Sequence, residues 1–79
     1  MFRYHLNIYD DAVALDEDGA EYADLGMARE AALCGAREMM AARLMAGKPI
    51  ALSHRIEITD GGGAVLATLK FREAMTIEP

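Results

Sequence analysis

The sequence predicts an α+β domain, a small two-layer sandwich in which one long helix covers one face of an antiparallel sheet. Two observations predict it. Residues 2–9 and 54–59 alternate between apolar and polar side chains, which is typical of strands with one buried face. Residues 24–46 form a long stretch of strong helix formers. The predicted order of the elements along the chain is β-β-α-β-β. An amphipathic helix packed on one face of an antiparallel sheet gives the two layers.

Two strands are predicted ahead of the helix. In residues 2–9, four apolar side chains share one face: Phe2, Tyr4, Leu6 and Ile8. The acidic pair at 10–11 ends this strand as a turn, and the short apolar run 12–15 returns as a second strand in a hairpin. Residues 16–19 have the composition of a loop, and residues 20–23 add a further extended piece.

The helix has clear start and stop signals. The Asp24 carboxylate can accept hydrogen bonds from the free amides of the first turn. Gly47 can take the left-handed conformation that ends a helix, and Pro49 prevents its continuation. At roughly 100° per residue, one broad stripe is expected to face the sheet. Its members are Leu25, Ala28, Ala32, Ala36, Met39, Met40 and Leu44.

Residues 54–59 and 64–71 form the last predicted hairpin, joined by a glycine-rich turn at 60–63. The return strand places four apolar residues on one face: Val65, Ala67, Leu69 and Phe71. We assign residues 1–73 to a single α+β domain and residues 74–79 to a C-terminal tail.

A second surface of the helix also carries small and apolar residues. One interpretation is that alanine simply serves as a good helix former on the surface. The other is that this surface packs against a second copy of the protein, because small residues allow close approach and Met adapts to irregular partners. The residues expected at such an interface are Ala31, Cys34, Gly35, Ala42 and Met45.

The size of the chain favours self-association. A domain of 79 residues buries only about 60% of its unfolded surface, so small scaffolds often add a disulfide, a metal or a second subunit. Cys34 is the single cysteine and cannot form an internal disulfide. His5, His54 and Cys34 lack the close pairings of zinc sites. We therefore expect no metal, no cofactor and a homodimer.

Charge and hydropathy limit the partners. Eight basic residues stand against thirteen acidic ones, a formal net charge of −5, so we do not expect binding to nucleic acid as a global property. No apolar run approaches the ~20 residues of a membrane span. Residues 1–11 lack the features of a signal peptide. Together with the lone cysteine, these features lead us to expect a cytoplasmic protein without a membrane partner.

No pattern of catalytic residues is present, so we do not expect an enzyme. Neither His5 nor His54 has a nucleophile placed beside it, and Cys34 lies mid-helix beside alanines. The acidic segment 10–24 does not match the pattern of a helix-loop-helix calcium loop. Aligning Gly19 with the invariant glycine of that loop leaves apolar residues at two ligand positions. A solvated turn and a helix cap are favoured, and weak cation binding by this segment stays open.

The polar face of the predicted sheet supports an alternative. It carries four basic or titratable residues: Arg3, His5, Arg55 and Lys70. Basic and aromatic residues on an open sheet are chemically similar to some RNA-binding surfaces. The net charge opposes this interpretation, and cross-strand pairing on a solvated face is favoured.

Three segments together carry a resemblance to a known family: FRYHLNIYDD, ADLGMAREAALCGAREM and RIEITDGGGAVLATLKF. Over residues 2–73 the chain resembles a family of short alphaproteobacterial proteins, of rhizobial type, catalogued as a domain of unknown function. The resemblance implies no activity, cofactor or catalytic residue. Over residues 2–46 the chain also resembles, more loosely, the antitoxin half of bacterial toxin–antitoxin pairs, whose small domains also place a capped helix after short strands.

The expected function is therefore that of a small, cytoplasmic, non-enzymatic module that self-associates and binds an unknown protein partner. The alternative is an antitoxin-like regulator, linked to nucleic acid, that uses the polar sheet face.

Overall fold

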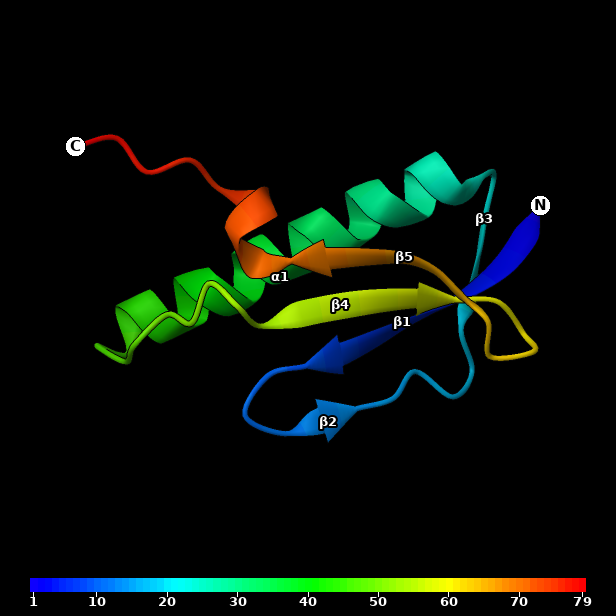
Figure 1. Cartoon of the computed structure of the whole chain (residues 1–79), viewed down its shortest axis with the longest axis horizontal. Coiled ribbons are helices and arrows are strands. Elements are labelled where there is room, and N and C mark those ends of the chain that lie inside the picture. The colour runs from blue at the N-terminus through cyan, green and yellow to red at the C-terminus, as the bar shows by residue number, and fades with distance from the viewer.

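One helix lies across one face of an antiparallel sheet in the computed structural model, which describes residues 1–79 (Figure 1). The central strand β1 (Phe2–Tyr9) pairs with β4 (Arg55–Thr59) on one side. On its other side it pairs with two short strands, β2 (Val13–Ala14) and β3 (Ala20–Tyr22). Strand β5 (Val65–Lys70) pairs with β4, so the main strand order is β2-β1-β4-β5. The predicted fold class is confirmed.

The helix α1 (Leu25–Met45) begins and ends where its capping residues predict. The Asp24 carboxylate accepts a hydrogen bond from the backbone N–H of Met27 at 2.9 Å. Gly47 has φ +69°, the left-handed conformation that closes the helix. Neither this helix nor the short one that follows β5 is long and apolar enough to cross a membrane.

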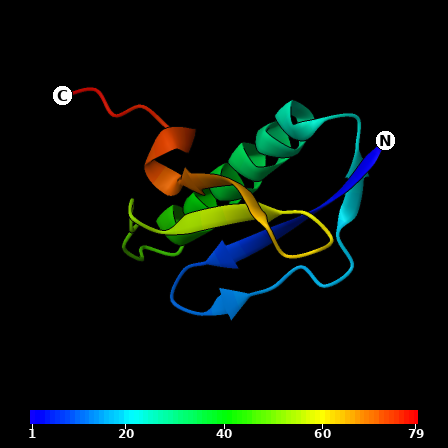
Figure 2. The same cartoon turned by 45° about the vertical axis from the view of Figure 1, so that its right-hand side comes forward.

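The core lies between α1 and the sheet, and alanines line the helix side of it. Ala28, Ala32 and Ala36 are buried together with Met40. The rest of the buried apolar set comes from the last hairpin and the segment after it: Ile56, Ile58, Leu69, Phe71 and Ala74. Small side chains let the helix backbone come close to the strands, and Figures 1 and 2 show α1 running along one face of the sheet.

The structure corrects two details of the predicted apolar faces. Leu44 was expected to face the sheet, but it is 69% exposed because it lies further round the helix than Met40. Val65 was expected on the buried face of its strand, but it is exposed. Its pairing with Thr59 is shifted relative to the rest of the ladder, as in a β-bulge, and this shift breaks the alternation of the strand.

The C-terminal boundary of the domain also differs from the prediction. Phe71 does not continue the strand; it begins a short 3₁₀ helix, η1 (Phe71–Ala74), and its side chain is buried. Ala74, assigned from the sequence to the tail, is only 4% exposed. Its carbonyl accepts a hydrogen bond from the Arg37 guanidinium at 2.7 Å. The folded domain therefore includes η1, which packs beside α1 (Figure 2).

Each outer edge of the sheet has a feature that limits its free backbone. On one side, at the end of β5, the Lys70 N–H donates to the Glu73 carboxylate at 2.7 Å. On the other side, β2 and β3 are two and three residues long.

We expect the two parts of the C-terminal segment to differ in their effect on stability. A chain that ends after Glu73 loses Ala74 and the half-buried Met75, so its free energy of unfolding should fall by about 1–3 kcal/mol. A chain that ends after Thr76 loses only exposed residues and should stay within about 0.5 kcal/mol of the full chain. Urea unfolding followed by circular dichroism measures both. Equal stability of the two chains would contradict the packing of η1.

Candidate functional site

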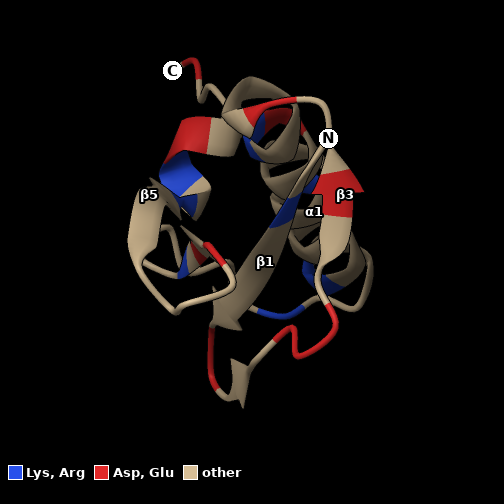
Figure 3. Cartoon of the chain, turned by 90° about the vertical axis from the view of Figure 1, so that its right-hand side faces the viewer, with Lys and Arg blue, Asp and Glu red and all other residues tan.

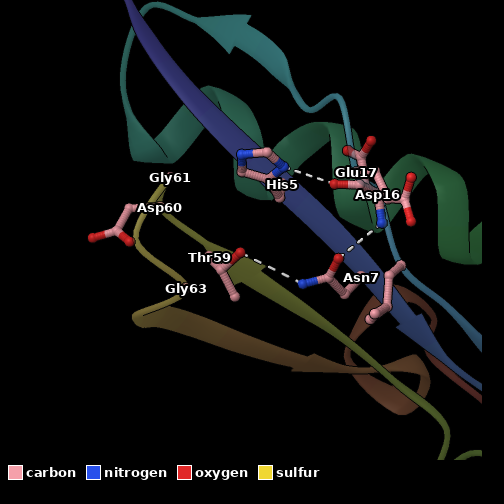
Figure 4. Close-up of a pocket in the computed structure, with 9 residues that line it drawn as sticks. His5, Asn7, Asp16, Glu17, Thr59, Asp60, Gly61 and Gly63 are labelled. Carbon is pink, nitrogen blue, oxygen red and sulfur yellow. Dashed lines mark hydrogen bonds between the residues drawn. The ribbon is translucent and has the colours of Figure 1, made fainter.

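A polar pocket opens on the face of the sheet that points away from α1, near the end of β4 (Figure 4). Its volume is about 230 Å³. Three parts of the chain build it: β1, the end of β4 with the turn that follows, and the loop between β2 and β3. The residues that line it are His5, Asn7, Leu15, Asp16, Glu17, Thr59, Asp60, Gly61 and Gly63.

Asp16 organises this pocket by filling a gap along the edge of β1. Strands β2 and β3 pair with the two ends of β1 and leave its middle open. There the Asp16 carboxylate accepts from the N–H of Leu6 at 3.2 Å and from the N–H of Gly19 at 3.0 Å. Its backbone N–H donates to the Asn7 side-chain oxygen at 2.9 Å. One aspartate thus takes the place of strand pairing at this position.

Gly19 allows the loop to lie against β1. Its φ is +67°, and a Cβ at this position would lie 2.8 Å from the Tyr4 carbonyl oxygen and 3.0 Å from the His5 ring. Only glycine fits this position without a shift of the backbone, because the closest atom belongs to a strand. The close approach holds the His5 ring between the strand and the loop.

The local contacts determine which atoms of the pocket remain free. The Asp16 carbonyl lies 2.7 Å from Nδ1 of His5. A carbonyl can only accept, so Nδ1 carries the proton and Nε2 keeps a free lone pair in the neutral ring. Thr59 is 7% exposed, and its hydroxyl oxygen accepts from the Asn7 amide at 3.5 Å. The pocket therefore combines fixed polar groups with free acceptors.

The charged side chains that line the pocket are all acidic: Asp16, Glu17 and Asp60. They belong to the acidic turns that are visible in Figure 3. No group of three or more His, Cys, Asp and Glu side chains in the structure has an arrangement that could hold a metal ion.

A second pocket of about 270 Å³ lies at the C-terminal end of α1, lined by Asp11, Ala42, Arg43, Ala46 and Lys48. The Arg43 guanidinium lies 2.8 Å from the Asp11 carboxylate. This hydrogen bond and the positive charge of Arg43 hold the pKa of Asp11 below its ordinary value of 3.8. The same contact raises the pKa of Arg43. The ion pair ties the helix end to the turn between β1 and β2.

His54 also lies near this turn. Its Nε2 is 3.6 Å from the Asp11 carboxylate, and its ring meets the ring of Phe71 edge-on. Its Nδ1 is buried without a hydrogen-bond partner. The ring thus contacts both the β1–β2 turn and the start of η1.

The residues predicted for a helix interface lie on the part of α1 that the sheet leaves uncovered. Cys34, Ala42 and Met45 are exposed, and Ala31 and Gly35 are half-buried. The Cys34 thiol donates to the Glu38 carboxylate at 3.8 Å. Ala42 lines the second pocket, and none of the five residues lies in the first.

The residues predicted for the sheet face are separated by their own pairings. Arg3 lies 3.7 Å from Glu21, its cross-strand neighbour, and donates to the Asp18 carbonyl at 2.9 Å. The Arg55 guanidinium lies 3.0 Å from the Glu57 carboxylate and 4.3 Å from the centre of the Tyr9 ring. The contacts of Arg3 with Glu21 and of Arg55 with Tyr9 are cross-strand, whereas Arg55 and Glu57 belong to the same strand. His5 reaches the first pocket, and Lys70 is exposed at the edge of the sheet.

Asn7, Asp16 and Thr59 were missed as site residues from the sequence. The loop at 16–19 contains one local signal, because an aspartate three residues before a glycine can bond to the glycine's backbone N–H. The hydrogen bonds of Asp16 with Leu6 and Asn7 have no local signal in the sequence, because they depend on how the loop lies against β1.

Comparison with known proteins gives one finding for the chain. A family model described as a domain of unknown function (DUF6894) matches residues 3–72. No curated protein and no solved structure matches the chain.

Asp16 and its neighbour provide a matched test of the gap at β1. Asp16→Ala leaves the N–H groups of Leu6 and Gly19 without their acceptor, so the free energy of unfolding should fall by about 1–3 kcal/mol. Glu17→Ala removes an exposed carboxylate and should change it by less than about 0.5 kcal/mol. Urea unfolding measures both changes. Equal effects would show that Asp16 does not replace strand pairing.

The Asp11–Arg43 pair gives a prediction about pH. A carboxylate whose pKa is lowered in the folded state stabilises the fold above its unfolded pKa, and this contribution is lost as the pH falls through the folded pKa. Arg43→Met should return the Asp11 pKa toward 3.8, whereas Arg29→Met, at an exposed residue outside the ion pairs, should leave it unchanged. Carboxyl chemical shifts measured by NMR against pH report the Asp11 pKa directly. An unshifted Asp11 pKa in the unmodified protein would contradict the pair.

Proposed function

We propose that this chain, which belongs to the DUF6894 family of domains of unknown function, is a small, non-enzymatic interaction module that pairs with a second copy of itself. The match agrees with the family that the sequence resembles. An alphaproteobacterial source and a cytoplasmic location stay predictions, the second based on the lone cysteine.

The proposal rests on the outward side of α1. The residues there follow one another at alternating steps of four and three: Met27, Ala31, Cys34, Glu38, Ala41 and Met45. We call this line the outer seam. A repeat of about 3.5 residues keeps side chains on one side of a helix and is the spacing at which helices pair in coiled coils. In the outer seam, five of the six side chains are apolar or small.

The outer seam is exposed, and this is the observation that carries the proposal. Met27 is 55% exposed and Met45 is 88% exposed, although both are large apolar side chains. Cys34 and Ala41 between them are also exposed. Burial of such surface against a partner is favourable by roughly 25 cal/mol per Å² before the losses of association.

The outer seam is also complementary to itself when two helices run antiparallel. In one register, Met27 lies opposite Met45 of the second copy, and Ala31 lies opposite the second copy's Ala41. Cys34 then faces Glu38, the same donor and acceptor types that meet within one chain at 3.8 Å. In a twofold dimer the same surface of both copies forms the contact, so its residues must pair with one another in reverse order. The residues of the outer seam do so in this register.

Small residues beside the outer seam would allow the two helices to approach closely. A Cβ added to Gly35 would meet no atom within 4 Å, so this side of the helix is open. Ala42 is exposed on the same side. A polar residue at one position of such a line, here Glu38, is a known way to favour one register over others.

A second copy would also supply stability that the small core lacks. Only ten of the 79 residues are buried, and three of the four buried helix residues are alanines. Small domains with limited cores commonly gain stability through a second subunit. The antitoxin-like alternative has weaker support, because Arg3 and Arg55 on the sheet face already pair with carboxylates.

Arginine on the outer seam should produce a folded monomer. Ala41→Arg places a charge within the proposed contact, opposite Ala31 of the second copy, and Gly35→Arg places one beside it without a steric obstacle in the monomer. Val13→Arg changes a similarly exposed apolar residue on β2, away from the helix, so it should remain dimeric. Size-exclusion chromatography with light scattering, at high micromolar concentration, measures the mass. A monomeric unmodified protein, or dimeric Ala41→Arg and Gly35→Arg variants, would refute the proposal.

A further inference from the structure

We propose that an ion pair at each end of the outer seam, between Lys48 of one copy and Asp24 of the second copy, holds the two helices antiparallel. This inference rests on the dimer proposed above and names the residues that set its orientation. Asp24 caps the N-terminal end of α1, and Lys48 follows its C-terminal end (Figure 1). Within one chain these ends lie roughly 30 Å apart, at 1.5 Å per residue, so the two charges can meet only between copies.

Lys48 has a free positive charge. It is exposed and takes part in none of the ion pairs of the structure. It lines the second pocket together with Asp11, but the Asp11 carboxylate is bound by Arg43 at 2.8 Å. The Lys48 backbone N–H donates to the Arg43 carbonyl at 2.9 Å, so Lys48 stays against the last turn of the helix.

Asp24 has a free carboxylate oxygen at the other end of the helix. Asp24 is exposed, and its Oδ1 accepts from the Met27 backbone N–H at 2.9 Å. Its side chain takes part in none of the ion pairs of the structure. The capping contact therefore holds the carboxylate in place and leaves Oδ2 for a cation from outside the chain.

The register of the outer seam brings these two residues level with each other. In that register, Met27 lies opposite Met45 of the second copy. Asp24 lies three residues before Met27, and Lys48 lies three residues after Met45. Because the helices run antiparallel, equal steps outward from the two methionines reach the same level. Twofold symmetry repeats the contact at the other end of the seam.

Both charges also lie on the same side of the helix pair. Asp24 and Ala42 are eighteen residues apart, which is five turns of 3.6 residues, so they point in the same direction from the helix axis. Lys48 lines the second pocket beside Ala42. A twofold axis perpendicular to the plane of two antiparallel helices keeps equivalent sides together. The side of one copy that carries Lys48 therefore adjoins the side of the second copy that carries Asp24.

Charge disfavours the parallel arrangement of the same two helices. With parallel helices in register, Glu38 would lie beside Glu38 of the second copy, and Lys48 beside Lys48 of the second copy. Like charges placed opposite each other cost free energy, whereas the antiparallel arrangement pairs a cation with an anion at both ends. Charged residues that flank an apolar seam are a known determinant of helix orientation.

A double-mutant cycle on the dimer tests the ion pair. Lys48→Gln should raise the dissociation constant of the dimer about two- to tenfold at low ionic strength, because two exposed ion pairs are lost. Asp24→Asn should raise it by a similar factor, since asparagine keeps the helix cap but has no charge. The double variant should bind no more weakly than either single variant. Sedimentation equilibrium measures the dissociation constants.

Lys70→Gln is the matched control, because it removes the same charge from an exposed residue at the edge of the sheet. It should leave the dissociation constant unchanged. Equal weakening by Lys48→Gln and Lys70→Gln, or additive effects of Lys48→Gln and Asp24→Asn, would overturn the ion pair and leave the dimer standing. A monomeric unmodified protein would overturn the dimer and the ion pair together.

Discussion

The close approach of α1 to the sheet is the constraint on which the rest of the structure depends. Ala28, Ala32 and Ala36 form the inward line of the helix, and all three are buried. Short side chains bring the two layers together, but they contribute little apolar area per residue. Ile58 and Phe71 therefore supply the largest fully buried side chains of the core. With small residues on the inward side, larger apolar side chains such as Met27 and Met45 lie on the outward one.

The elements of this fold were predictable because their signals are local. Alternation in 2–9 and 54–59, the Asp24 cap and Gly47 each depend on neighbours within a few residues. The position of Phe71 was not predictable in this way. Alternation alone assigns it to the strand, but its backbone N–H bonds to the His54 carbonyl as the chain turns into η1. Contact with α1 decides that turn.

The candidate sites show the same division between local and distant causes. The exposed side of α1 follows from helical spacing, so the residues expected there lie where the sequence places them. The polar pocket depends on contacts between segments far apart in the chain, such as Asn7 with Thr59. Asp16 holds the pocket together through hydrogen bonds of both its side chain and its backbone. From sequence alone, Asp16 could be assigned only to an acidic turn.

The carboxylates at the two edges of the sheet have a consequence for the behaviour of the protein in a crowded solution. Open strand edges are templates for the growth of fibrils. Here Glu73 occupies the Lys70 N–H at one edge, and Asp16 occupies the Leu6 N–H along the other. Both blocking groups are carboxylates, so they also repel an approaching acidic copy of the same chain. These two carboxylates therefore disfavour the pairing of another acidic strand at these two positions.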